Sequence, residues 1–133
     1  MASIFTKIVS GDIPSHKVAE SELCYAFLDI NPLAVGHTLV IPKKEVDYIL
    51  DLDDELYLEL MRFAKQVGKS IESVVECKRI GITVIGLEVP HAHVHLIPIN
   101  QLNDMNFAKP KLNLCAIELE ELARKIAKAF ANG

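Results

Sequence analysis

The sequence predicts an α+β domain built on a mostly antiparallel sheet of about five strands, with one long helix and a C-terminal helix. Short apolar and β-branched runs, separated by turn residues, occur on both sides of one long segment of helical periodicity. The connections between these runs are short, which favours antiparallel neighbours. No repeat or low-complexity linker divides the chain. We therefore expect one domain over residues 1–133, with residues 110–133 as a C-terminal helical extension.

Three strands are expected in the first third of the chain. After an apolar stretch over residues 4–9, they are predicted over residues 16–20, 23–30 and 37–41. The first follows a turn signal at residues 10–12 and Ile13-Pro14, whereas the second and third are apolar, aromatic or β-branched and end at Asn31-Pro32 and Pro42. These strands form the first half of the expected sheet.

Two segments have helical periodicity. Asp51 is expected to cap the first helix, whose apolar residues recur at three- and four-residue steps: Leu52, Leu56, Leu60, Phe63, Val67, Ile71 and Val74. The second helix is expected over residues 116–130, with acidic residues early and lysines late, as the helix dipole favours. Between the helices, residues 80–85 and 92–99 predict two further strands, which a short connection would pair as antiparallel neighbours.

Composition narrows the classes of partner. The net charge is −4 and the basic residues are dispersed, which argues against a nucleic-acid partner, because that affinity depends on clustered phosphate neutralisation. No apolar run is long enough to span a membrane and no leader pattern opens the chain, so we expect a cytoplasmic protein without a membrane segment. Three widely spaced cysteines predict reduced thiols. Half of the residues are hydrophobic, so we expect a second subunit to cover an apolar face.

Histidine alternates with apolar residues in His91-Ala92-His93-Val94-His95-Leu96. In a strand, the period of two would place all three imidazoles on one face. Each buried imidazole has two ring nitrogens that need partners, so we expect a polar ligand over this face. His37, on the expected third strand, is a fourth candidate, whereas His16 is expected to be an ordinary structural residue.

From the residues alone, two kinds of chemistry remain open for these histidines. Three neutral imidazoles can hold zinc, but imidazoles along one strand are about 6.5–7 Å apart, so the strand supplies a third ligand only with difficulty. Phosphoryl chemistry suits this spacing better, because a nucleophile, a positioning group and an acid are spread along the ligand. We therefore expect no metal and no cofactor.

With these motifs in view, the sequence resembles the histidine triad family, in its branch of nucleotide-binding hydrolases and nucleotidyl transferases. Its signature of three alternating histidines is accompanied, in order and spacing, by residues 4–8, 13–14, 27–32 and 36–43. The resemblance covers about residues 3–99. It implies a homodimer joined through the sheet, a purine nucleotide or related nucleoside phosphate as ligand, and attack on the α-phosphate through a nucleotidyl-histidine intermediate.

The resemblance also implies the role of each polar residue. His93 would be the nucleophile, and His95 would hold the phosphate oxygens or assist the leaving group. The backbone carbonyl of His91 would accept the other N–H of His93, and His37 would support the site from the neighbouring strand. Asp29 would accept hydrogen bonds from both ribose hydroxyls, because a carboxylate has two acceptor oxygens.

An apolar slot for the base is implied as well. The family places it at positions that are apolar here: Ile4, Phe5, Ile8, Ile13, Phe27 and Leu39. Glu88 and Val89, shortly before the histidines, complete the expected ligand contacts. Apolar walls sandwich any purine or pyrimidine, so base identity is not readable from them.

The sequence departs from the family pattern in two places. Many relatives bind zinc through two cysteines and a histidine at the positions of Ser3, Thr6 and Glu45, which supports the expectation of no metal. The connection before the triad lacks the usual Asn and Gln, and Glu88 replaces a hydroxyl residue. Such a carboxylate should repel a polyphosphate chain and favour an amine leaving group, as in a nucleoside phosphoramidate. The alternative is that Glu88 simply faces solvent.

The sequence thus predicts a nucleoside phosphoramidase or related nucleotide hydrolase of the histidine triad type. Because the usual Asn, Gln and hydroxyl residue are missing, a competing hypothesis is a regulatory module that binds nucleotides without catalysis.

Overall fold

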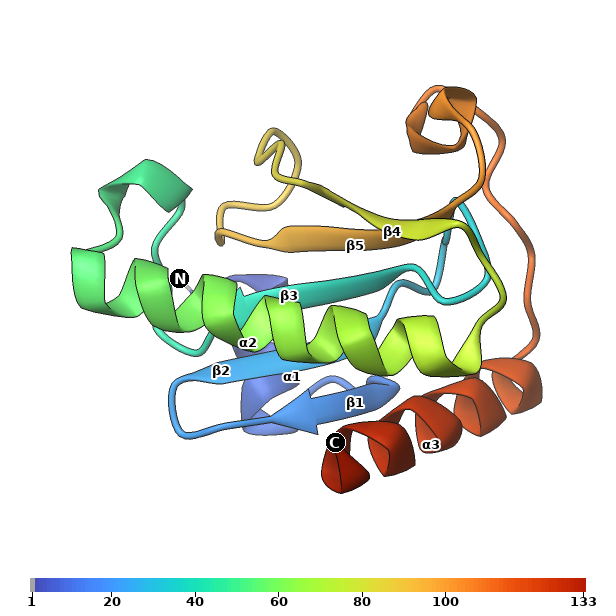
Figure 1. The fold of residues 1–133 in the computed structure, drawn as a ribbon. Helices are drawn as coiled ribbons and strands as arrows, with labels where there is room; N and C mark the ends of the chain where they lie inside the picture. The colour runs from blue at the N-terminus through green and yellow to red at the C-terminus, as the bar shows by residue number, and fades with distance from the viewer. Residues whose placement is uncertain (1) are drawn as a thin grey trace.

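The computed structural model describes residues 2–133 and contains one five-stranded antiparallel sheet, in the order β1-β2-β3-β5-β4 (Figure 1). Its strands are β1 (Lys17–Glu20), β2 (Cys24–Leu28), β3 (Thr38–Pro42), β4 (Arg79–Thr83) and β5 (Val94–Ile99). Every neighbouring pair is antiparallel, β4 and β5 included. The predicted α+β class is therefore confirmed.

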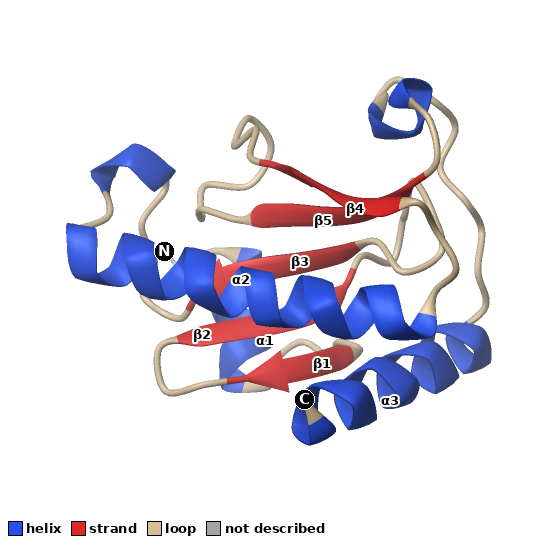
Figure 2. Ribbon diagram, in the orientation of Figure 1, coloured by secondary structure: helices blue, strands red, loops and turns tan. Residues whose placement is uncertain are grey.

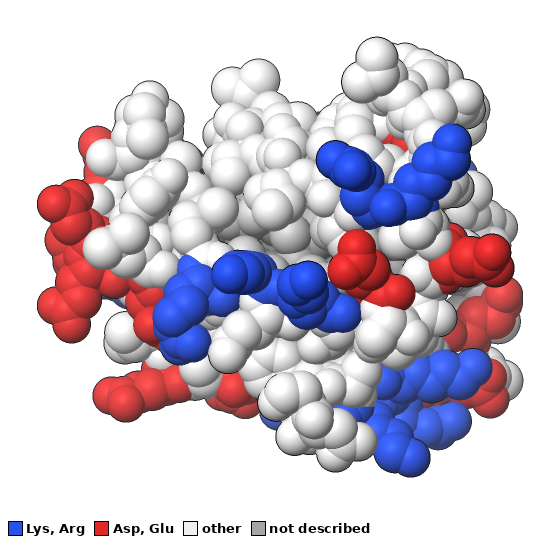
Figure 3. Space-filling model, in the orientation of Figure 1, with Lys and Arg blue, Asp and Glu red and all other residues white. Residues whose placement is uncertain are grey.

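Helices cover both faces of the sheet unequally (Figures 1 and 2). The long helix α2 (Asp54–Val74) and the C-terminal helix α3 (Ala116–Asn132) lie on one face, and the short helix α1 (Ile4–Ser10) lies on the other. No helix in residues 2–133 is long and apolar enough to cross a membrane. On the face shown in Figure 3, Lys and Arg side chains form a band along α2.

Successive side chains along each strand point to opposite faces of the sheet, so the protein has two separate cores. The larger one lies under α2 and α3 and includes Val40, Val94 and Leu96 together with Ile126 of α3. The smaller one lies under α1 and joins the residues that point to the opposite face: Phe5, Ile8, Tyr25, Phe27, Leu39 and Ile41. His95 is the register partner of Leu39. It therefore stands on the α1 face, beside the smaller core.

Two boundaries differ from the prediction for local reasons. Helix α2 is capped by Asp53, whose carboxylate accepts the Leu56 N–H at 2.8 Å, so the expected cap at Asp51 is wrong. Residue 51 instead ends the 3-10 turn η1 (Ile49–Asp51). The stretch at residues 4–9 was expected only to be apolar, and it is a helix with Ser3 as N-cap. Gly11 ends it at φ 89°, a conformation that suits glycine.

Candidate active site

Two adjoining hollows, of about 300 and 280 Å³, open on the α1 face of the sheet. Asp29, Asn31, Glu88, His93 and His95 line both of them. The smaller hollow is otherwise mainly apolar. It is lined by every residue expected in the base slot, together with the further expected contact Val89: Ile4, Phe5, Ile8, Ile13, Phe27, Leu39 and Val89. The other hollow adds His37, the loop from Ile85 to Leu87, and two residues from beyond β5, Phe107 and Lys111.

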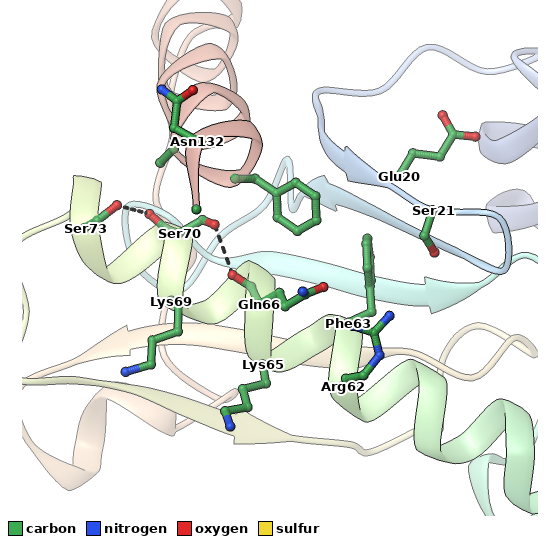
Figure 4. A pocket seen from close by; sticks show the side chains of 13 residues that line it. Glu20, Ser21, Arg62, Phe63, Lys65, Gln66, Lys69, Ser70, Ser73 and Asn132 are labelled. Atoms are coloured by element: carbon green, nitrogen blue, oxygen red, sulfur yellow. Dashed lines mark hydrogen bonds between the residues drawn. The ribbon is translucent and has the colours of Figure 1, made fainter.

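A larger hollow, of about 910 Å³, lies away from the histidines, between α2, α3 and the turn after β1 (Figure 4). Phe63 and Phe130 line it, with ring centroids 5.6 Å apart, and Lys65 and Lys69 extend from α2 (Figure 4). It holds no histidine and no cysteine. His37, His93 and His95 line the two smaller hollows instead.

All three histidine rings lie on the α1 side of the sheet, where Phe5 packs against both His91 and His93, but only His93 and His95 line the hollows. The rings of His93 and His95 lie 5.0 Å apart between centroids and both line the hollows. The ring of His91 lines neither. Strand β5 begins only at Val94, because the Ala92 N–H leaves the ladder and donates to the carbonyl of Val46 at 2.7 Å. The predicted start of this strand at residue 92 is therefore wrong, whereas the ring of His91 lies on the α1 side, against Phe5 and Ser3.

The ring of His91 is instead held inside the protein. Its Nε2 lies 2.8 Å from the carbonyl oxygen of Pro42, which can only accept, so the ring proton is on Nε2. Its Nδ1 must then accept from the hydroxyl of Ser3, 2.8 Å away. Glu45 completes this network, because one carboxylate oxygen accepts both the Ser3 N–H and the Thr6 hydroxyl at 2.6 Å. The network attaches α1 to the segment that carries the histidines.

The same reasoning assigns the proton of His93. Its Nδ1 lies 2.7 Å from the carbonyl oxygen of His91 and must donate to it. The lone pair of this ring is therefore on Nε2. No fully buried side-chain nitrogen or oxygen in residues 2–133 lacks a partner, and Nε2 of His93 makes no hydrogen bond within the protein. This nitrogen consequently reaches the open cleft with its lone pair available.

A second chain of hydrogen bonds orients His95. The Leu33 N–H donates to Nδ1 of His37 at 3.0 Å, so the proton of His37 is on Nε2. That Nε2–H donates to Nδ1 of His95, also at 3.0 Å. The proton of His95 is therefore on Nε2, on the side of the ring away from His37. The cleft thus presents a lone pair on His93 and an N–H donor on His95.

Burial keeps the imidazoles His37 and His95 neutral. It lowers the pKa of His37 to about 3 and that of His95 to about 4, and the positive charge on a neighbouring histidine opposes their protonation further. Asp29 lies 3.6 Å from Nε2 of His37, close enough for an ion pair if the ring were charged. Because burial lowers the pKa of His37, its ring is neutral and the Asp29 contact is not an ion pair.

Asp29 follows the last residue of β2 and lines both hollows. Its Oδ1 accepts the Asn31 N–H at 2.8 Å, which fixes the carboxylate in a turn. Burial raises the pKa of Asp29, and the nearby carboxylate of Glu88 acts in the same direction. Glu88 itself is exposed at the rim of the cleft.

The residue types around the cleft could bind a metal ion, but their hydrogen bonds make a metal site less favourable. In residues 2–133, three ligand atoms that could share an ion come from Asp29, His37 and His95, not from the three triad histidines. In this group, Nδ1 of His37 accepts the Leu33 N–H, and its Nε2 bonds to His95. A metal would have to break that hydrogen bond.

Sequence comparison identifies the family to which this cleft belongs. The sequence model of the HIT domain matches residues 10–102, which is more than half of the chain. The chain belongs to the histidine triad family. Its match to this family confirms the resemblance based on the alternating histidines, although the ring of His91 does not line the cleft.

Several relatives of this histidine triad protein align over nearly its whole length. An uncharacterized HIT-like protein of Borreliella burgdorferi is 37% identical over 132 residues, covering 93% of this chain and 95% of the relative. Adenosine 5′-monophosphoramidase hnt1 of Schizosaccharomyces pombe is 36% identical over 130 residues, with coverage of 96% and 97%. Among solved structures, a HIT-like protein from Bartonella henselae has a TM-score of 0.83 at 32% identity, with coverage of 96% and 95%.

Two residues of the cleft in this histidine triad protein lie outside the matched region and were not predicted. The ring of Phe107 packs edge-on against His95, with centroids 4.9 Å apart, and against His37 at 6.2 Å. Lys111 lines the same hollow. The segment between β5 and α3 has no periodicity or motif, so nothing in the sequence indicated that it returns to the histidines.

Proposed function

We propose that this protein hydrolyses nucleoside 5′-phosphoramidates through a nucleotidyl intermediate on His93. Membership of the histidine triad family supports a nucleotide hydrolase, and the fission-yeast relative is named an adenosine 5′-monophosphoramidase. The observation that carries the proposal is the pair of assigned tautomers. An available Nε2 lone pair on His93 lies beside an N–H donor on His95, in one cleft.

The nucleotide is placed by complementary surfaces. Its base would occupy the apolar hollow between α1 and the sheet, while the ribose hydroxyls would donate to Asp29 at the junction of the two hollows. The α-phosphate then lies over His93 and His95. The leaving group points into the second hollow, which is lined in part by Glu88.

The reaction has two steps. Nε2 of His93 attacks phosphorus, the P–N bond breaks, its electron pair stays on nitrogen, and the leaving nitrogen takes a proton from solvent to depart as an amine. The carbonyl of His91 stabilises the positive charge that develops on the His93 ring. In the second step, water attacks phosphorus, the N–P bond breaks, and the nucleoside monophosphate and one proton leave. Throughout, the Nε2–H of His95 donates to a phosphate oxygen, supported by His37.

A trapping experiment tests this proposal. The protein is mixed with adenosine 5′-phosphoramidate, quenched at alkaline pH and examined by mass spectrometry, and we expect adenylylated His93. The His93→Ala variant should lose turnover by more than about 10³-fold, whereas His16→Asn, outside the cleft, serves as the matched control. Turnover by His93→Ala at the wild-type rate would refute the nucleophile. Tight nucleotide binding without adenylylation or turnover would favour the competing hypothesis of a regulatory module.

The role of Glu88 is tested separately. Its carboxylate at the rim should repel a polyphosphate leaving group and tolerate an amine. Glu88→Ser is therefore expected to raise kcat/KM for a dinucleoside polyphosphate relative to a phosphoramidate. Unchanged selectivity would mean that Glu88 only faces solvent.

We also propose that two copies pair through β4, in the cytoplasm. This strand is an edge of the sheet, and Ile82 on it is 53% exposed. Light scattering should report a dimer for the wild type and a monomer for Ile82→Lys. A monomeric wild type would refute this arrangement.

A further inference from the structure

The segment between β5 and α3 closes one side of the cleft. After β5 the chain forms the short 3-10 turn η2 (Leu102–Met105), and Figure 1 shows it running down the edge of the domain to α3. Two contacts hold this segment against the site. The ring of Phe107 packs on His95 and His37, and the Leu112 N–H donates to the carbonyl of Pro32 at 2.8 Å. The family match ends at residue 102, so this wall lies outside the part of the chain that defines the family.

Lys111 carries a positive charge on this wall. Its ammonium donates to the carbonyl oxygens of Phe107 at 2.6 Å and Lys109 at 3.2 Å, and it lies 6.0 Å from the centre of the Phe107 ring. These contacts hold the flexible side chain against the same segment. An ammonium has three N–H donors, so one is left for a ligand. Within residues 2–133, Lys111 makes no ion pair with a carboxylate.

The position of Lys111 is on the leaving-group side of the site. It lines the hollow that contains His37, His93, His95 and Glu88, and it does not line the apolar hollow assigned to the base. Its charge also reaches the site: burial chiefly lowers the pKa of His37 and raises that of Asp29, and the Lys111 ammonium adds to the first shift and partly offsets the second. Given the nucleotide placement proposed above, Lys111 faces whatever group is bonded to the α-phosphate.

We propose that Lys111 is a specificity-determining residue that binds a carboxylate on the leaving amine, so that the preferred substrates are nucleoside 5′-phosphoramidates of amino acids. This inference rests on the proposed function. In such a compound the α-nitrogen is bonded to phosphorus, and the carboxylate is two bonds from that nitrogen. One free N–H donor beside one ring wall suits a single carboxylate. The volume of about 300 Å³ is at the small end of ligand pockets, and Glu88 in the same hollow disfavours a longer polyanion.

With this substrate the same bonds form and break as in the two steps proposed above. His93 attacks phosphorus, the bond from phosphorus to the α-nitrogen breaks, and the nitrogen takes a proton from solvent, so that the free amino acid leaves. Water then releases the nucleoside monophosphate from His93. Lys111 takes no part in bond breaking, and it acts by holding the carboxylate.

A matched pair of substrates tests the proposal. Adenosine 5′-phosphoramidates of alanine and of alaninamide differ only in whether the leaving group has a carboxylate or a neutral amide. We expect wild type to favour the alanine compound by about tenfold in kcat/KM, since an exposed charge-assisted contact is of that order. Lys111→Met should bring the ratio of the two kcat/KM values close to one, and Lys111→Glu should invert it. Lys109→Met, on the same segment, is the matched control and should keep the wild-type ratio.

Binding to the His93→Ala variant separates this proposal from the proposed function. With turnover removed, calorimetry should still show tighter binding of the alanine compound, and the added Lys111→Met substitution should remove the difference. If neither compound adenylylates His93 but this Lys111-dependent difference in binding persists, the proposed function fails and the carboxylate site stands. Equal binding and equal kcat/KM for the two compounds in wild type would overturn the proposal, as would a ratio that Lys111→Met leaves unchanged.

Discussion

Lowering the pH should destabilise the fold through His37. Burial lowers the pKa of this ring to about 3, whereas in the unfolded chain a histidine binds a proton near pH 6.5. Between these two values the unfolded state binds more protons than the folded state, so the free energy of unfolding falls as the pH falls. The stability is fully present above about pH 6.5 and is lost progressively toward pH 3.

The magnitude follows from the width of that window. At pH 4.5, about two units below the unfolded pKa, His37 alone should cost about 2.7 kcal/mol of unfolding free energy, at 1.36 kcal/mol per unit. His95, whose pKa is lowered to about 4, adds a similar loss. Asp29 acts in the opposite direction, because its raised pKa lets the folded state take up a proton in acid more readily. Since domains have only about 5–15 kcal/mol in total, the histidines should dominate acid unfolding.

Urea unfolding of wild type and His37→Asn between pH 8 and pH 4 measures this contribution. The variant should lose less stability per pH unit, with a difference in slope of about 1.4 kcal/mol per unit between pH 6 and pH 4. Val40→Ala, a cavity-forming change on the same strand, should lower the stability at every pH and keep the wild-type slope, because it removes no titrating group. Parallel slopes for wild type and His37→Asn would refute the description of His37 as a buried neutral ring.

Three further substitutions test other parts of the structure. Ser3→Ala should lower the free energy of unfolding by about 1–3 kcal/mol, because it leaves a buried imidazole nitrogen of His91 without its donor. Ser10→Ala, which removes an exposed hydroxyl, should change it by no more than about 0.5 kcal/mol. Equal effects of the two substitutions in urea unfolding would contradict the Ser3–His91 network. Asp29→Asn should weaken AMP binding about tenfold in calorimetry. Binding of 2′,3′-dideoxy-AMP, which lacks the ribose hydroxyls, should be nearly unaffected, and an equal loss for both ligands would exclude a contact to the ribose. Ile126→Ala should lower the free energy of unfolding by about 2–4 kcal/mol in thermal or urea unfolding, because this side chain of α3 is fully buried. Ile117→Ala, at a side chain that is 69% exposed, should lower it little. Similar values for the two variants would mean that α3 is not part of the core.

Periodicity was enough to predict the sheet and the two long helices. The strands differ from the predicted ranges by only a few residues, since apolar alternation and flanking turn residues both act locally. Helix α1 was missed because seven residues contain too few turns for a periodic pattern. The Ser3 cap and the left-handed Gly11 are the sequence signals that bound it.

The cleft was predicted less completely, because it depends on contacts that are distant in sequence. All the expected apolar slot residues line one hollow, because strand alternation turns Phe27 and Leu39 toward the face that α1 covers with its own apolar residues. His91 lies beneath α1 and outside the cleft, where its ring accepts a hydrogen bond from the hydroxyl of Ser3, 88 residues away in the sequence. No local pattern encodes that hydrogen bond. Phe107 and Lys111 reach the cleft through a segment without periodicity, so their position follows from the fold alone.

The protons of the cleft are also set by the fold rather than by residue identity. A free imidazole exchanges between two tautomers, whereas here one backbone N–H, at Leu33, and one backbone carbonyl, at His91, decide which nitrogen of three rings carries the proton. Charge would not achieve the same result. A protonated His95 would bind phosphate oxygens more strongly, but its positive charge would oppose the cation that forms on His93, 5.0 Å away, when that ring attacks phosphorus. A neutral donor avoids this conflict, and burying His37 and His95 is the physical means by which the fold keeps it neutral.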